Sequence, residues 1–434
     1  MIEKARVLFL AFSGIRVQNK RLLELGYQSV ELRHRAYTIA SLPSLGLLTL
    51  AGMTPESWES KYHEFSADTM GVIQEFQPDL IAFSTLTASV ESACDFVKQL
   101  HGLNITCVIG GLAASTLPMA TFKDFDSIIQ GDGESSWSQV LDDCLSKSLK
   151  KVYKNTKPYN FNQSPIPKWE LLGQEKRARY TVQTQRGCSK ACSFCGASRL
   201  LGPLRFKKDE LIAKELFELK KYTKAQVVEL ADDNTFALGT RDALFDALEA
   251  SKIRYFTEAE WSIGENPEIL SRLSKSGCVQ VLVGVESSVQ TYSGMGNKVG
   301  HLDRIFKAID NIQKSGVSVI ACFIVGVDGE TKESIENLGD IIVNSGLSDV
   351  QITLQTPFPG TRLYKNLYKQ GRLLKNRSWS YYTLFDVTFE PSNMSVKELE
   401  NSYYDLMKRV YSNSQSEKRK LIRKQIWKIA SKLK

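Results

Sequence analysis

The sequence predicts an α/β protein with an N-terminal doubly wound domain, a full or partial (β/α) barrel and a small, mostly helical C-terminal region. Short apolar runs alternate with helix-like stretches along residues 1–148 and again along residues 179–370, which is typical of parallel sheets covered by helices. Between these series, residues 149–178 form a polar stretch with two prolines, typical of an interdomain linker. Residues 371–434 are less regular and end in a long helical pattern.

In the first series, strands are predicted at residues 6–12, 80–84, 106–109 and 127–129, and helices at 90–100 and 135–145. Doubly wound sheets bind ligands at the carboxyl ends of their strands, so the loops after these strands are candidate binding loops. Their small and hydroxyl-bearing residues would let the backbone approach a large flat ligand. The candidates are Ser84, Thr85, Thr87, Gly110, Gly111, Ser115, Gly131, Gly133 and Glu134. Ordinary turns have the same composition, so a purely structural role stays open.

The second series predicts strands at residues 180–183, 227–230, 279–285, 318–324 and 350–354, separated by helices at 208–221, 241–251, 267–276 and 302–315. A (β/α) barrel places its active site at the carboxyl ends of its strands. The polar and glycine-containing segments of this half follow those ends. The C-terminal region adds Phe358, Arg362, Tyr381, Tyr382 and Phe385 as candidates for lining a substrate pocket, although aromatic residues there could equally belong to the core.

The charge of the chain is concentrated at its C-terminus. The formal net charge is +8, and residues 417–434 hold eight Lys or Arg against one Glu, so the rest is nearly neutral and no nucleic-acid partner is expected. The same residues predict a basic amphipathic helix, which could contact an anionic membrane surface peripherally or dock on the body of the protein. The chain shows neither a long apolar run nor a cleavable leader, so we expect a cytoplasmic location.

Three of the eight cysteines, Cys188, Cys192 and Cys195, lie within eight residues in C-x3-C-x2-C spacing, directly after the strand at 180–183. Soft thiolate ligands select iron-sulfur clusters or zinc. Zinc would require a fourth ligand, and the four histidines are remote in sequence. In a 4Fe-4S cube, three thiolates leave one iron for an amino acid's amine and carboxylate. A plain electron-transfer cluster remains an alternative. The other five cysteines are scattered, as expected for buried small hydrophobes in a reducing compartment.

This spacing, with the aromatic Phe194 directly before the third cysteine, resembles the signature of the radical S-adenosylmethionine (SAM) superfamily. The resemblance implies a 4Fe-4S cluster that takes an electron from a donor such as flavodoxin or ferredoxin and cleaves SAM to methionine and a 5'-deoxyadenosyl radical. It also implies that strand-end residues contact SAM, although they could be solvated polar groups. These are Phe194, Asp232, Asp233, Asn234, Glu286, Ser287 and Gly326, with Arg199 and Arg205 as candidates for the SAM carboxylate.

Segments 43–48, 78–80, 110–111 and 131–134, in this order, resemble the branch of the superfamily with an N-terminal cobalamin (B12)-binding domain. The resemblance implies that the nine loop residues above bind cobalamin. The Asp-x-His-x-x-Gly loop that ligates cobalt in cobalamin mutases is absent after the first strand, where the sequence reads Ser-Gly-Ile-Arg-Val at 13–17. Cobalamin would then bind without a histidine below cobalt, or the domain has kept only its fold.

The implied function is C-methylation of an unactivated carbon in a small molecule, namely a natural-product, cofactor or lipid precursor. A radical SAM isomerase, cyclase or rearrangement enzyme that keeps a cobalamin-type domain without methyl transfer is an alternative. A non-catalytic iron-sulfur redox or scaffold protein is a second. No catalytic side chain is identified by the sequence, and the substrate is not either.

Overall fold

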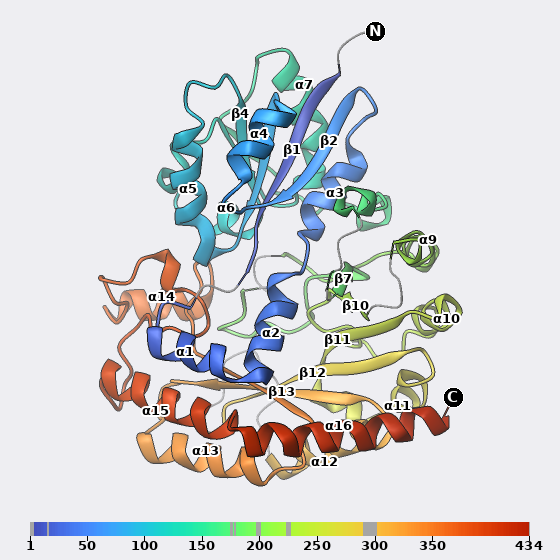
Figure 1. Ribbon diagram of the computed structural model, residues 1–434, viewed down its shortest axis with the longest axis vertical. Coiled ribbons are helices and arrows are strands. Elements are labelled where there is room, and N and C mark those ends of the chain that lie inside the picture. Colours follow the sequence, from blue (N-terminus) through green and yellow to red (C-terminus); the bar gives the residue numbers. More distant parts are fainter. Residues whose placement is uncertain are drawn as a thin grey trace.

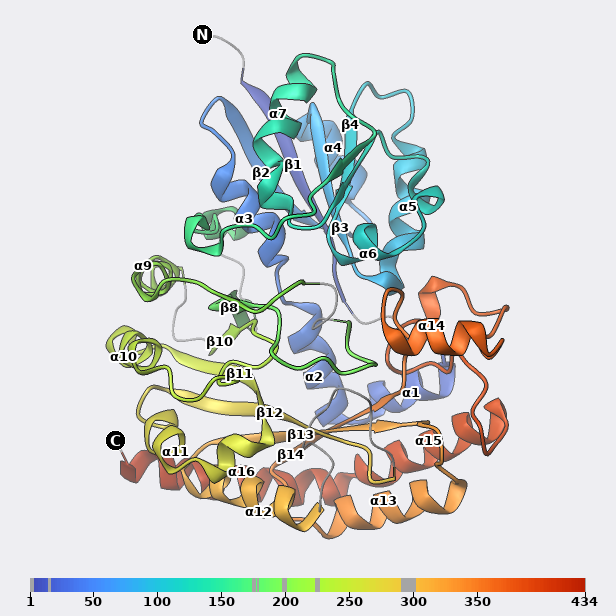
Figure 2. The same cartoon turned by 180° about the vertical axis from the view of Figure 1, so that it is seen from behind.

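The computed structural model describes residues 4–14, 17–173, 177, 179–196, 201–222, 227–289 and 302–433. Within them the chain forms two six-stranded parallel sheets and a short two-stranded one. The first sheet lies at one end of the molecule and the second at the other (Figures 1 and 2). The α/β architecture, with C-terminal helices, is therefore as predicted.

The N-terminal sheet has the strand order β2-β1-β3-β4-β5-β6. Its strands are β1 (Ala5–Phe12), β2 (Trp58–Glu64), β3 (Leu80–Thr85), β4 (Thr106–Gly110), β5 (Ser127–Gln130) and β6 (Val152–Lys154). Two of them, β2 and β6, are missing from the prediction, because an edge strand needs few apolar residues and each has charged residues. Since β6 pairs with β5, the sheet continues into residues 149–178, where a linker was predicted.

Helices cover both faces of this sheet, which makes it doubly wound. They are α3 (Leu45–Met53), α4 (Thr69–Phe76), α5 (Val90–Gln99), α6 (Leu112–Thr116) and α7 (Trp137–Leu145). Because side chains alternate along a strand, Val7 and Phe9 of β1 pack in one core with α3 and α7, whereas Leu8 and Leu10 pack in another with α4 and α5.

The second sheet has the order β14-β13-β12-β11-β10-β7, and its end strands do not pair, so the barrel is partial. The strands are β7 (Arg179–Val182), β10 (Val227–Leu230), β11 (Arg254–Glu260), β12 (Cys278–Glu286), β13 (Ser318–Val325) and β14 (Asp349–Leu354). The helices are α9 (Asp209–Lys220), α10 (Asp242–Ser251), α11 (Pro267–Leu273), α12 (Leu302–Lys314) and α13 (Lys332–Asn344). Strand β11 was not predicted, because charged residues interrupt its apolar pattern.

Two helices of the N-terminal half, α1 (Lys20–Gln28) and α2 (Val30–Ala40), leave the first sheet and lie against the second (Figure 1). Arg35 of α2 donates a hydrogen bond to the backbone oxygen of Val350 in β14 at 2.5 Å and lies 3.7 Å from the Asp349 carboxylate. Helix α15 (Val396–Val410) binds the same strand, since the Tyr403 hydroxyl donates to the Ile352 oxygen at 2.8 Å. The open side of the partial barrel at β14 is thus covered.

The segment Val30–Met53 has the length and mean hydropathy, 1.3, of a membrane-crossing helix. In the structure this segment forms two separate helices, because α2 ends at Ala40 and α3 begins at Leu45. One such segment is weak evidence for a membrane span, since core helices pass the same test, and Leu47 and Leu48 of α3 are buried in the first core.

The predicted basic amphipathic helix is α16 (Asn413–Leu433), which follows α14 (Arg362–Lys369) and α15 along the chain. It docks on the body: Arg419 and Arg423 lie 2.6 Å and 3.3 Å from the Glu31 carboxylate, and Ile426 is buried. Most of its lysines remain exposed.

Candidate cofactor and substrate site

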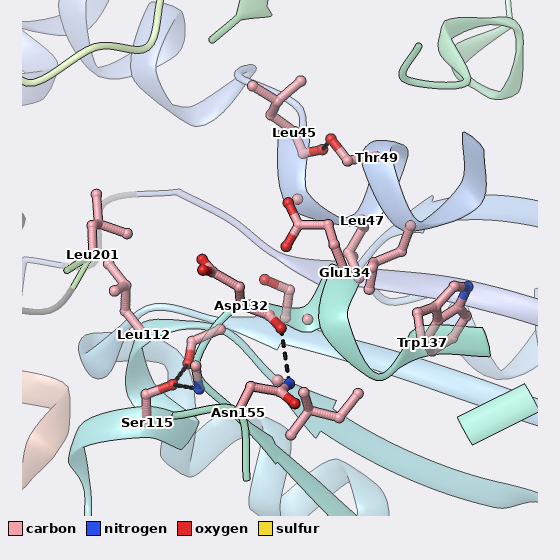
Figure 3. A pocket seen from close by; sticks show the side chains of 18 of the residues that line it. Leu45, Leu47, Thr49, Leu112, Ser115, Asp132, Glu134, Trp137, Asn155 and Leu201 are labelled. Carbon is pink, nitrogen blue, oxygen red and sulfur yellow. Dashed lines mark hydrogen bonds between the residues drawn. The ribbon is translucent and has the colours of Figure 1, made fainter. Parts of the chain in front are cut away.

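A cavity of about 510 Å³ lies where the carboxyl ends of β3, β4 and β5 face the second half of the chain. The cofactor cavity, as we call it, is lined by eight of the nine loop residues predicted to bind cobalamin, namely Ser84, Thr85, Gly110, Gly111, Ser115, Gly131, Gly133 and Glu134. Figure 3 shows Leu45 and Leu47 of α3 on one side, Leu112 and Ser115 of α6 on another, and Asp132 and Glu134 between them. Gln183, Arg186 and Arg205 close it from the second half.

The residues of this cavity fit a large ligand with polar edges. The Thr85 hydroxyl is buried and has no hydrogen-bond partner within the described part of the chain, so a ligand group could satisfy it. Gly111 has a φ of 93°, a conformation that favours glycine, and it exposes its backbone to the cavity. At Gly46 of α3 an added Cβ would meet no atom within 4 Å, so that side of the cavity is open.

Glu134 lines the cavity and also forms an ion pair within the protein. The Arg186 guanidinium lies 2.7 Å from the Glu134 carboxylate and 2.8 Å from that of Asp132, while Arg205 lies 2.6 Å from Asp132 on its other oxygen. Burial opposes ionisation of Asp132, but the hydrogen bonds and charges of Arg205 and Arg186 hold its pKa below the usual value. Arg205, a candidate for the SAM carboxylate, is thus engaged by Asp132, and Arg199 lies outside the described residues.

These two arginines flank the cysteine loop. Arg186 ends β8 (Gln185–Arg186) and Arg205 begins β9 (Arg205–Phe206), and the two short strands pair antiparallel. The cysteines therefore lie on a loop whose base is attached to the cofactor cavity. This attachment was not predicted, since its partners are far apart in the sequence; the position of Arg186 beside Gly187 at the start of the loop was the available signal.

The loop lies against the carboxyl end of β13, because Cys192, Phe194 and Cys195 pack with Ile324 and Val327. The Leu363 amide also donates to the Ser193 oxygen at 2.9 Å. Among the described residues, no three His, Cys, Asp or Glu side chains converge as a single metal ion requires. A 4Fe-4S cube has no such requirement, because each thiolate binds a different iron.

The scattered cysteines lie apart from this loop. Cys107 and Cys278 are buried, and Cys94, Cys144 and Cys322 are partly buried. Burial raises the pKa of Cys278 to about 12, which keeps its thiol neutral.

At the end of β10, two of the three predicted SAM contacts brace other loops. Asp232 is buried and accepts hydrogen bonds from the amides of Thr184 and Gln185 at 2.8 Å and 3.1 Å, which fixes the strand entering the cysteine loop. Asn234 accepts from the Glu260 amide at 3.1 Å. Within the described residues Asp233 has no side-chain partner, and burial together with the Asp232 charge raises its pKa to about 6. Of the three, Asp233 therefore remains the candidate for a ligand contact, although it is not among the residues that line either cavity.

The predicted contacts at the ends of β12 and β13 are joined by Glu330, which sequence reasoning missed. Ser287 donates to one Glu330 oxygen at 3.4 Å, and the Gly326 amide donates to the other at 2.6 Å. Glu330 is buried, and burial raises its pKa to about 7. Glu286, the third residue, is buried with a φ of 71°, at an irregularity in the register of β12 and β13. An acidic residue four positions after Gly326 was the available signal for this bridge.

A second cavity of about 620 Å³, the apolar cavity, lies beside the first, since Leu86 and Leu112 line both. Thr87, predicted to bind cobalamin, lines this cavity. So does Gly196, which directly follows Cys195. Of the proposed pocket-lining residues of the C-terminal region, Phe358, Tyr382 and Phe385 are present, whereas Arg362 and Tyr381 are not among its lining residues.

The family model "Radical SAM superfamily" matches residues 182–342, which include the cysteine loop and β10 to β13. The chain belongs to this superfamily. A second model, "B12 binding domain", matches residues 39–141, which include the loops of the cofactor cavity. The protein is therefore a radical SAM enzyme of the branch with an N-terminal B12-binding domain, and its cofactors are a 4Fe-4S cluster, SAM and cobalamin.

Two curated relatives of this radical SAM protein are named methyltransferases. One is an uncharacterized methyltransferase of Pyrococcus horikoshii, 26% identical over 82% of this chain and 85% of the relative. Another is the bacteriochlorophyllide d C-12(1)-methyltransferase of Chlorobaculum tepidum, 23% identical over 87% and 84%. The fold is similar to that of the cobalamin-dependent SAM radical enzyme OxsB with aqua-cobalamin bound, with a TM-score of 0.68, 15% identity, and coverage of 92% of this chain and 66% of OxsB.

Proposed function

We propose that the protein is a cobalamin-dependent radical SAM C-methyltransferase that methylates an unactivated carbon of a natural-product, cofactor or lipid precursor. One observation carries the proposal: the apolar cavity shares Leu86 and Leu112 with the cofactor cavity and is also lined by Gly196, which directly follows the third cysteine. A substrate carbon in the apolar cavity would thus lie next to both cofactors. The methyltransferase names of the relatives support the same assignment.

When bound, SAM at the cluster supplies the radical that activates the substrate carbon, and cobalamin supplies the methyl group. The residues of the chain position these groups. Cys188, Cys192 and Cys195 would hold the cluster, and the Asp233 carboxylate would receive the methionine amine of SAM. Because the pKa of Asp233 is raised to about 6, this carboxylate is ionised above that pH. Leu86 and Leu112 lie at the boundary that the two cavities share.

The test is an anaerobic assay of the chain reconstituted with iron and sulfide, using SAM and a chemical reductant, with and without hydroxocobalamin. A methyltransferase produces 5'-deoxyadenosine, and it produces S-adenosylhomocysteine only when the corrinoid is present. Formation of 5'-deoxyadenosine with neither corrinoid retention nor S-adenosylhomocysteine would reject methyl transfer in favour of an isomerase or cyclase. Absence of both products from an iron-loaded chain would favour a redox or scaffold protein.

The proposed reaction also requires an electron donor such as flavodoxin or ferredoxin, and a reducing, cytoplasmic location suits the thiolate ligands. Contact of α16 with an anionic membrane is a separate proposal, supported by its exposed lysines. Because Arg419 and Ile426 are buried, deleting the helix would damage the body. Charge reversal of Lys420, Lys424 and Lys428 is the cleaner test, and unchanged sedimentation with phosphatidylserine vesicles would reject the contact.

A further inference from the structure

We propose that the apolar cavity binds the hydrocarbon part of a lipid-like substrate whose head group is neutral or acidic, not an amine. The inference rests on the proposed function, because it assigns the substrate class of that same reaction. The cavity of about 620 Å³ is large enough for an extended or polycyclic hydrocarbon of small-ligand size.

Most of the lining is apolar. Side chains from four parts of the chain contribute, including Leu22, Leu25, Ile39, Ile352, Leu384 and Met407. Burying hydrocarbon against such a surface gains roughly 25 cal/mol per Å² of apolar area. A sugar, nucleotide or peptide would instead lose more hydrogen bonds to water than the few polar groups of this lining replace. The composition therefore favours a hydrocarbon ligand.

The charges at the cavity exclude a cationic head group. Among the described residues that line it there is no Asp or Glu, so an ammonium group would lack a counterion from them. The charged residues of this described lining are Arg33 and Arg35, both on α2. Arg35 pairs with Asp349, whereas the Arg33 side chain is exposed and has no partner within the described residues. An acidic or hydroxyl head group would be compatible with Arg33 at this position.

The opening of the cavity lies where α1 and α2 present apolar side chains to solvent. Leu23 and Tyr27 of α1 line the cavity and are 41% and 67% exposed. Val30 and Tyr37 on the same two helices are exposed as well. Exposed apolar side chains gathered at the mouth of a cavity are typical of a ligand entrance. The cavity then continues inward to Gly196 beside the third cysteine, so that a bound hydrocarbon would reach from solvent to the cofactors.

The experiment measures hydrocarbon binding to the chain reconstituted with cluster and hydroxocobalamin, so that the cofactor cavity is filled. The fluorescence of bound 1-anilinonaphthalene-8-sulfonate reports occupancy, and geranylgeraniol, hexadecanoic acid, hexadecylamine and tryptophan are the competitors. Two variants fill the cavity: Gly26→Leu, at a helical position where a Cβ would meet no atom within 4 Å, and Ala36→Trp on α2. Gly71→Leu is the matched control, at an exposed position of α4 outside both cavities, with equally open space.

We expect geranylgeraniol and hexadecanoic acid to displace the probe from the wild type and the control, and to bind at least about tenfold more weakly to both filled variants. Hexadecylamine and tryptophan should compete poorly. Equal affinity of wild type and both filled variants, or displacement by hexadecylamine as strong as by geranylgeraniol, would overturn the inference. S-adenosylhomocysteine formation by the wild type is assayed separately, so hydrocarbon binding without this product would reject methyl transfer while leaving the cavity assignment intact.

Discussion

The Arg186 guanidinium donates a hydrogen bond to the Asp132 carboxylate at 2.8 Å, and this contact joins the two halves of the protein at the cofactors. Asp132 lies on the loop after β5 that lines the cofactor cavity, and Arg186 is two residues before the first cluster cysteine. The two side chains are only 12% and 13% exposed, so the pair is weakly screened by solvent. The position of the cysteine loop relative to the cofactor cavity is thus set in part by one side chain that bridges two carboxylates.

Replacing Arg186 with methionine should destabilise the interface between the two halves. The change leaves Asp132 and Glu134 buried with only Arg205 to compensate them, and removing one partner of a buried ion pair costs roughly 3 kcal/mol. The first transition in calorimetry of the holo-protein should move to lower temperature, and corrinoid should be lost more readily on gel filtration. Arg304→Met, which removes an exposed pair with Glu265, is the control and should change neither. An unaltered transition in Arg186→Met would show that the pair does not hold the halves together.

Gly46→Leu should block cobalamin binding without damaging the fold. Gly46 is on α3, lines the cofactor cavity, and offers open space where a side chain would begin, so leucine would occupy the ligand's volume. Corrinoid retention, measured by visible absorbance after gel filtration, should fall at least about tenfold. The melting temperature of the apo-protein should not fall, since leucine is a better helix former than glycine. Normal retention by this variant would place cobalamin elsewhere, and Gly71→Leu again provides the control.

Glu330→Gln should reduce the pH dependence of stability. Burial raises the pKa of Glu330 from 4.5 to about 7, so the native state binds this proton more tightly than the unfolded state. The resulting stabilisation is present below pH 4.5 and is lost as the pH rises through about 7. The melting temperature of the glutamine variant minus that of the wild type should therefore be larger at pH 8 than at pH 6. Glu333→Gln changes an exposed residue of α13 and should show the same pH dependence of melting temperature as the wild type. If Glu330→Gln also showed the wild-type pH dependence, the raised pKa of Glu330 would be contradicted.

Cys192→Ala should abolish cluster assembly while leaving cobalamin binding intact. With two thiolates remaining, the cluster loses a ligand, so iron content and 5'-deoxyadenosine formation should fall to background. Cys144→Ala is the matched control, because burial raises the pKa of that thiol and keeps it from acting as a ligand. If the Cys192 variant kept the iron content and activity of the control, the cysteine loop would not be the cluster site.

Much of the site could be predicted because its signals are local. The cysteine spacing, the small residues after β3, β4 and β5, and the apolar periods of most strands each depend on neighbours within about ten residues. The cofactor cavity accordingly contains eight predicted residues. The exceptions follow the same reasoning. Thr87 begins the helical turn Thr87–Ser89, directly after Leu86, and lines only the apolar cavity. Charged residues interrupt the pattern of β2 and β11, and β6 is only three residues long.

By itself the sequence therefore determined the α/β class, the cluster cysteines and the order of the two halves, since these depend on periodicity and short spacings. The tertiary structure alone decided which polar side chains form hydrogen bonds within the protein. Asp232 and Asn234 read as ligands in the sequence, yet backbone amides that adjacent strands bring to them take up their oxygens. It also decided that α1 and α2 cover the β14 edge and line the apolar cavity, because Arg35 meets Val350 across more than 300 residues, and no local pattern encodes such a contact.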